Sequence, residues 1–113
     1  MKTDYLTSGS TLPPYLAYPR FLLGIDVRLI AKEVYMILLD MVYSGTGTQT
    51  DGHGRRYLMF YNKTIAEIID RTPSTVAQSL RELEDAGLIE KKLISRSAPY
   101  HVYVKLPDGK DSV

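Results

Sequence analysis

A run of short polar side chains in the second half of the sequence could hydrogen-bond to the edges of nucleic-acid bases. Hydroxyl, amide and guanidinium groups occur there at five positions: Ser74, Thr75, Gln78, Ser79 and Arg81. Apolar side chains are interleaved with them at helical spacing: Val76, Ala77, Leu80 and Leu83. A helix over residues 73–86 would therefore turn its apolar stripe to the core and the polar residues to the opposite face. In the major groove, Gln can read adenine, and Ser or Thr can pair with several bases.

A second polar cluster lies at the expected tip of a β-hairpin. The run 100–106 alternates apolar and polar residues and, with the run 88–94 before it, predicts two paired strands. The cluster consists of Ser95, Arg96 and Ser97 at the tip, with Lys91 and Lys92 behind them. A tip with one Arg and several hydroxyls is suited to phosphates or to the minor groove. Further backbone contacts are expected from residues in or beside the preceding helices: Lys63, Arg71 and Thr72.

The residues before the polar helix predict a helix-turn-helix. Asn62 is a candidate N-cap for a short helix over residues 62–70. Thr72 can cap the second helix, and Pro73 suits its first turn because that N–H would have no partner in any case. Gly87 is expected to end the second helix in a left-handed conformation. Because so few residues join the two helices, they should cross steeply and expose the start of the second one.

The strongest helix pattern covers residues 27–43. One face carries Val27, Ile30, Ala31, Val34, Tyr35, Leu38, Met41 and Val42. Apolar residues outside that stripe are Leu29, Met36, Ile37, Leu39 and Tyr43. Such a helix is buried on more than one side, either by the aromatic arm over residues 15–23 or by another subunit. Asp26 is a candidate cap for its start.

The remaining segments complete an α+β, mostly helical winged helix-turn-helix with a C-terminal β-hairpin as its wing. Residues 44–54 are rich in Gly and Thr and predict a loop, and the apolar run 57–61 predicts a brief strand. We expect one domain over residues 15–106, with flexible tails at 1–14 and 107–113.

Composition limits the classes of protein that the chain can be. Its 113 residues contain no Cys and no apolar run long enough to cross a bilayer, so neither disulfides nor membrane attachment is expected, and the cytoplasm is the expected compartment. Residues 55–105 carry nine Lys and Arg against six acids, and this basic bias is too mild to indicate nucleic acid by itself.

Catalytic and metal-binding patterns are absent from the sequence. His53 and His101 have no partner at metal-ligand spacing, and residues 45–48 lack the length and the Lys of a phosphate loop. No nucleophile and base stand at a recognisable spacing. We therefore expect no metal, no cofactor and no enzymatic activity.

Three other interpretations of the polar helix remain open. Ser, Thr and Gln on an outer helix face are often ordinary solvated residues. Glu82, Glu84 and Asp85 would repel phosphates unless the last turns of the helix point away from them. Some winged helices dock proteins instead of DNA, and others control transcription.

The sequence resembles the N-terminal domain of the replication initiator protein A family over about residues 15–106. The similar segments, in order, are Tyr18-Pro19-Arg20-Phe21-Leu22, Ala31-Lys32, Val34-Tyr35-Met36-Ile37-Leu38-Leu39-Asp40, Asp51-Gly52, Phe60-Tyr61-Asn62, Ile65-Ala66-Glu67-Ile68, Ser74-Thr75-Val76, Leu80-Arg81-Glu82-Leu83 and Gly87-Leu88-Ile89. Their order and spacing are more specific than any one of them. One difference is Arg28, at a position where the family often has Ser.

The resemblance implies a sequence-specific, double-stranded DNA-binding domain that acts in plasmid or mobile-element replication. Members of the family start replication of theta-type plasmids in Gram-positive bacteria, and full initiators carry a further C-terminal domain. The resemblance also implies a homodimer on repeated origin sites, with replisome proteins as further partners. The arm over residues 15–23 and the helix over residues 27–43 are the expected dimer contacts.

Overall fold

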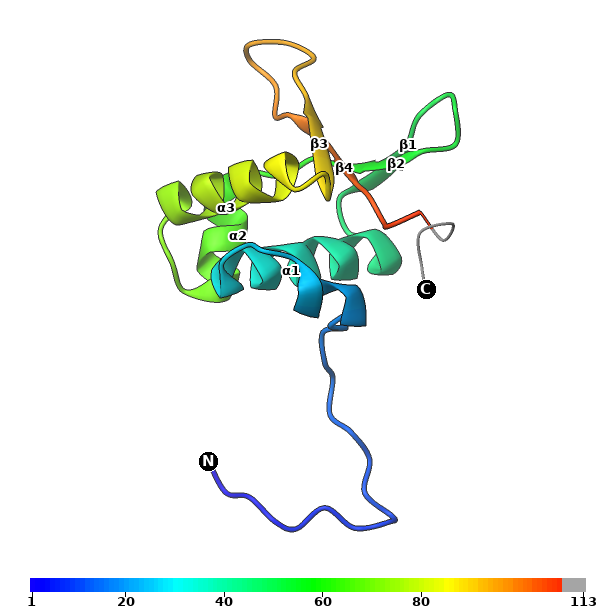
Figure 1. The fold of residues 1–113 in the computed structure, drawn as a ribbon, viewed down its shortest axis with the longest axis vertical. Coiled ribbons are helices and arrows are strands. Elements are labelled where there is room, and N and C mark those ends of the chain that lie inside the picture. The colour runs from blue at the N-terminus through cyan, green and yellow to red at the C-terminus, as the bar shows by residue number, and fades with distance from the viewer. Residues whose placement is uncertain (109–113) are drawn as a thin grey trace.

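The computed structural model describes residues 1–108 and has three α-helices and a four-stranded antiparallel sheet (Figure 1). In chain order the elements are the 3₁₀ helix η1 (Arg20–Gly24), α1 (Leu29–Ser44), β1 (Thr48–Thr50), β2 (Arg56–Leu58), α2 (Asn62–Ile69), α3 (Pro73–Asp85), β3 (Ile89–Lys92) and β4 (His101–Val104). The strand order is β1-β2-β4-β3. This arrangement confirms the predicted α+β winged helix-turn-helix with β3 and β4 as its C-terminal hairpin.

Helix α1 lies at the centre of the core, and the chain itself covers most of its apolar surface. Ile37 and Leu39, which lie outside the predicted stripe, are buried. The arm contributes Leu22, which is fully buried, while Leu29 and Tyr43 remain 72% and 75% exposed. The apolar excess of this helix therefore does not by itself require a second subunit. The helix begins later than predicted, with Arg28 and not Asp26 as its N-cap.

The two helices of the helix-turn-helix are joined by three residues. Helix α2 begins at Asn62 itself, with Tyr61 as the N-cap, so the prediction that Asn62 caps this helix is wrong. Asp70 ends the helix with φ 54° and ψ 52°, a left-handed conformation that reverses the chain abruptly. Thr72 then caps α3 by accepting a hydrogen bond from the Thr75 N–H at 3.2 Å, as predicted. Gly87, with φ 78°, ends the turn after α3.

The sheet contains one strand that the sequence pattern missed. Residues Thr48–Thr50, within a predicted loop, pair with Arg56–Leu58 and form β1. The side chains of this segment are polar, which is typical of a loop. The strand is held by backbone pairing with β2 and by the Thr48 hydroxyl, which donates to the Met41 carbonyl at 3.0 Å. The predicted strand at 57–61 ends at Leu58, and the wing strands are also shorter than the predicted runs.

The chain before η1 leaves the body of the molecule as an extended segment (Figure 1). Residues 1–19 contain no helix or strand, whereas the last residues of the predicted arm, 20–23, lie in η1. The predicted C-terminal tail, 107–113, lies mostly outside the described residues, which end at 108.

Candidate nucleic-acid interface

The exposed face of α3 carries three of the polar side chains predicted for it. Ser74, Gln78 and Arg81 are exposed, whereas Val76, Leu80 and Leu83 are buried against the rest of the domain. Because residues three and four apart share a helix face, the exposed three form one surface pointing away from the core. They offer a hydroxyl, an amide and a guanidinium to a ligand.

Ser79 does not belong to this surface, and its prediction as an outward residue is wrong. Its exposed fraction is 0%, and its hydroxyl has no hydrogen-bond partner among the described residues. The buried stripe from Val76 continues at Ser79, not at Ala77, which is only half-buried. Helix α3 is therefore rotated relative to the prediction, because packing selects the i, i+3, i+4, i+7 set that includes Ser79.

We expect Ser79→Ala to leave the domain as stable as before or to stabilise it by about 1 kcal/mol. A buried hydroxyl without a partner costs roughly 1–3 kcal/mol, and alanine removes that cost while filling almost the same space. Urea unfolding followed by circular dichroism measures the difference. A loss of stability of about 1 kcal/mol or more would mean that the hydroxyl has a hydrogen-bond partner in solution.

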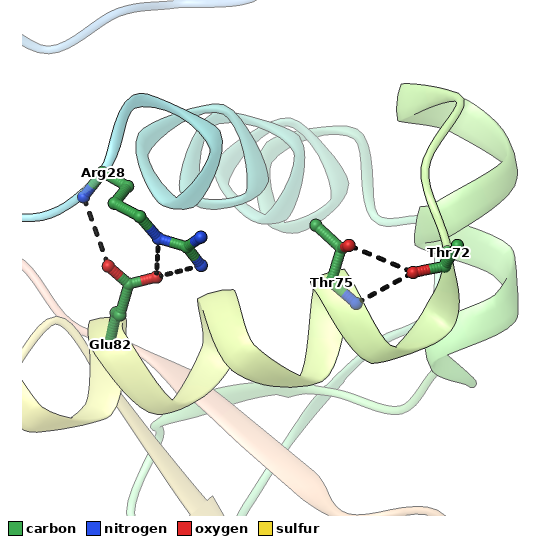
Figure 2. Close-up of polar contacts among 4 residues, drawn as sticks. All are labelled: Arg28, Thr72, Thr75 and Glu82. Carbon is green, nitrogen blue, oxygen red and sulfur yellow. Dashed lines mark hydrogen bonds and ion pairs between the residues drawn. The ribbon is translucent and has the colours of Figure 1, made fainter.

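The start of α3 is held by a local hydroxyl pair. The Thr75 hydroxyl lies 3.0 Å from the Thr72 hydroxyl, which also accepts the Thr75 N–H (Figure 2). Thr75 is half-buried and lies on the flank of α3 that faces α1. Among the hydroxyl side chains predicted to contact DNA from within α3, only that of Ser74 is exposed to solvent. Thr72, the N-cap residue, is exposed at the end of the helix.

Glu82 lies half-buried on the flank of α3, one turn after Gln78, and is bound by Arg28. The Arg28 Nε and Nη2 atoms donate to Glu82 Oε2 at 2.9 and 2.7 Å, and the Arg28 backbone N–H donates to Oε1 at 3.3 Å (Figure 2). The side-chain hydrogen bonds from Arg28 lower the pKa of Glu82 and raise that of Arg28. This pair, which the sequence pattern did not reveal, compensates a negative charge on the helix that carries Gln78.

The next acid on α3 is also engaged by the chain. Glu84 Oε2 accepts the Lys91 backbone N–H at 3.1 Å, which fixes the start of the wing to α3. Asp85 is exposed in the last turn of the helix. The prediction that these acids lie away from the start of α3 agrees with their positions.

The two lysines of the wing lie on opposite faces of the sheet. Lys91 pairs with the buried Val102, whereas Lys92 pairs with His101. Successive residues of a strand point to opposite faces, so only Lys91 faces the helices. The prediction that both lysines stand beside α3 is wrong for Lys92, whose ammonium lies 5.0 Å from the Tyr103 ring centroid on the outer face.

A cavity of about 370 Å³ separates the wing from the start of α2. Arg96 and Lys91 line it, together with Asn62 and Tyr100, and the Lys91 ammonium lies 5.0 Å from the Tyr100 ring centroid. Two cations facing a helix N-terminus make this cavity suitable for an anion such as a phosphate. The sequence pattern did not identify Tyr100 as part of this cavity. Its position next to Pro99, where the hairpin loop ends, was the signal that could have placed it near the wing tip.

The remaining predicted contacts are exposed around this cavity and the turn. They are Lys63, Arg71, Ser95 and Ser97. The Ser95 and Ser97 hydroxyls are 3.5 Å apart, and Arg71 Nη1 donates to the Asp70 carbonyl at 3.1 Å. Within residues 1–108, neither Arg81 nor Arg96 forms an ion pair. Both cations are therefore available to an external anion.

Residues 1–108 contain no cluster of His, Cys, Asp and Glu able to hold a metal ion. In the same part of the chain, no helix has the length and apolar character needed to cross a membrane.

Comparisons with known proteins give one family and several similar folds. The family model described as replication initiator protein A (RepA) N-terminus matches residues 19–110. A structure described as the N-terminal domain of a DNA-binding protein superposes with a TM-score of 0.72 at 18% identity, over 97% of this chain and 88% of its own. A Rep–DNA complex gives 0.70 at 20% identity, over 84% and 77%. An MDR initiator gives 0.69 at 20% identity, over 84% and 78%. None of the curated proteins matches the chain.

Proposed function

Because the chain belongs to the family of replication initiator protein A N-terminal domains, we propose that it binds specific double-stranded DNA to initiate or control plasmid or mobile-element replication. The main support is the exposed row Ser74, Gln78 and Arg81 on a capped helix beside a cationic wing. One similar fold is described as a Rep–DNA complex and another as an initiator. The proposed role is binding in the cytoplasm, where plasmid DNA is located, and not catalysis.

In this proposal α3 enters the major groove and the wing braces the adjacent backbone. Gln78 reads a base edge, and Ser74 and Arg81 flank it. Arg96 and Lys91 hold a phosphate at the cavity between wing and α2, which fixes the register of the helix. Lys63 and Arg71 add backbone contacts from α2 and the turn.

We propose further that the active form is a homodimer on repeated sites. The apolar residues that the single chain leaves exposed favour a contact through the arm and the start of α1: Tyr15, Tyr18, Leu23 and Leu29. Two copies would then set the spacing of the half-sites. Light scattering tests this, and a monomer at high micromolar concentration, with and without DNA, would contradict it.

Selection of bound duplexes from a random pool tests the proposed function. The selected and a scrambled duplex are then titrated by fluorescence anisotropy at physiological salt. We expect the selected duplex to bind at about 10⁻⁸ M or somewhat more weakly, and the scrambled one far more weakly. Equal affinity for both would contradict specific recognition and favour a protein-docking module. The positions of selected sites, in a replication origin or beside a promoter, would distinguish replication from transcriptional control.

Arg28→Ala is expected to weaken duplex binding several-fold, although Arg28 lies outside the proposed interface. Without the guanidinium, the Glu82 carboxylate is uncompensated one turn from Gln78 and repels phosphates. Anisotropy with the selected duplex measures the loss. Adding Glu82→Gln in the same background removes the charge and should restore affinity. If Arg28→Ala and Arg28→Ala/Glu82→Gln lose the same affinity, the cause is a change in folding and not the charge of Glu82.

A further inference from the structure

The outer face of the sheet, opposite the helices, carries a row of three aromatic rings. Tyr57 and His101 stack with ring centroids 4.2 Å apart and planes 14° apart. Tyr103 lies directly across the ladder from Tyr57, with ring centroids 5.5 Å apart. All three side chains are only partly buried. These rings lie on the solvent-facing side of the sheet, opposite the side on which Leu58 and Val102 enter the core, so they are not part of that core.

The row ends at a basic cavity of about 450 Å³ where Tyr103 forms one wall. Arg55, Arg56 and Lys105 also line this cavity. The backbone of Lys105 is held on both sides, since its N–H donates to the Leu88 carbonyl at 2.8 Å and its carbonyl accepts the Tyr35 hydroxyl at 2.7 Å. The cavity is therefore built on fixed backbone, and its volume is within the range of ligand sites.

The acids near the cavity are already engaged by the chain. Glu90, the one carboxylate in the cavity lining, has Oε1 3.5 Å from the Lys92 ammonium. Asp51 accepts hydrogen bonds from the His53 and Arg55 backbone N–H groups and from the Tyr103 hydroxyl. Within residues 1–108, the three cations of the cavity form no ion pair. Arg56 Nη1 donates to the Val42 carbonyl at 3.4 Å, so Arg55 and Lys105 are the cations that this site offers to an anion beside the row of rings.

We propose that this outer face, here termed the aromatic–basic face and formed by Arg55, Tyr57, His101, Tyr103 and Lys105, binds single-stranded DNA. A phosphate occupies the cavity, and unpaired bases stack along the rings. Base–aromatic stacking next to a cationic groove is the general mode of single-strand recognition. A duplex cannot use this face in the same way, because its bases are stacked on one another and turn only their edges outward.

This site is separate from the proposed duplex-reading face. The duplex face is formed by α3 and the inner side of the wing, whereas His101, Tyr103 and Lys92 point to the opposite side of the same strands. The choice of DNA over RNA rests on the proposed function in replication, since duplex opening produces single strands beside the bound protein.

Fluorescence anisotropy of the whole chain with a labelled oligothymidylate of ~12 nucleotides tests the proposal. Arg55→Ala/Lys105→Ala is expected to weaken this binding about tenfold and to reduce the salt slope by about 1.4, while duplex affinity stays unchanged. Lys2→Ala removes a charge from the exposed N-terminal segment, outside the arm proposed to contact a second copy, and should have no such effect. Gln78→Ala/Arg96→Ala should weaken duplex binding only.

Photo-crosslinking gives an independent readout that does not depend on variants. An oligothymidylate with 5-iodouracil should crosslink to Tyr57, His101 or Tyr103, and an excess of the selected duplex should not compete. Crosslinks confined to α3 or the wing tip, complete competition by the duplex, or unchanged affinity in Arg55→Ala/Lys105→Ala would overturn the proposal. Tighter binding of oligouridylate would overturn the assignment to DNA. If the wild-type chain binds the oligothymidylate but no duplex specifically, the proposed function is contradicted and the single-strand site is not.

Discussion

Tyr35→Ala is expected to lower the free energy of unfolding by about 3–5 kcal/mol, a large part of the stability of a domain of this size. The ring is 0% exposed in the centre of α1. It meets Phe21 of the arm edge-on, with centroids 5.8 Å apart and planes 80° apart. Its hydroxyl donates to the Lys105 carbonyl at 2.7 Å, beyond the end of β4. One side chain thus joins the arm, the central helix and the sheet. Urea unfolding measures the loss.

Tyr35→Phe separates the ring from the hydroxyl. It keeps the ring packing and removes only the donor to Lys105, so a smaller loss of roughly 1–2 kcal/mol is expected. Equal losses in the two variants would show that the hydrogen bond, not the packed ring, dominates the contribution of Tyr35.

The same hydroxyl is expected to make the domain less stable in alkali. Burial, and to a lesser degree the charge of Tyr43, raises the pKa of Tyr35 to about 12 from an ordinary value of 10.0. Because the folded pKa is the higher one, the contribution is complete below pH 10 and is lost as the pH rises toward 12. Urea midpoints across this range should fall less in Tyr35→Phe than in the wild type. Parallel curves for the two proteins would contradict this assignment.

Gln78→Ala is expected to relax base preference at one position of the selected site, at a cost of ~1–3 kcal/mol for the preferred base. Gln78 is exposed at the middle of the α3 face, between Ser74 and Arg81, and its amide can both donate to and accept from a base edge. Alanine keeps the helix and removes both functions. Anisotropy with duplexes that differ at one base pair measures the change, and an unchanged preference would exclude Gln78 from base reading.

Arg96→Ala is the matched control for Gln78→Ala. Arg96 lies at the wing cavity and is proposed to meet a phosphate, which carries no sequence information. Its loss should weaken all duplexes alike and flatten the salt slope by about one unit. The two variants therefore separate reading from positioning even if both lower the total affinity.

The sequence by itself determined the elements whose signals are local. The cap at Thr72, the first-turn Pro73 and the left-handed Gly87 mark the limits of α3, and the structure confirms all three. The alternation in residues 100–106 likewise predicted the second wing strand. These signals work because capping, backbone conformation and strand period depend on neighbouring residues only. Together with the order of the elements, they were enough to predict the winged helix.

Only the tertiary structure decided the rotation of α3, the pairing of β1 and the faces of the wing lysines. Ser79 and Ala77 are both small, so composition could not say which one enters the core; packing against α1 and the sheet did. Arg28 meets Glu82 across 54 residues of sequence, a contact for which no local pattern exists. The aromatic–basic face likewise requires β2 to pair with β4. Long-range packing and strand register select among arrangements that local propensities leave equal in energy, and those choices placed each candidate side chain.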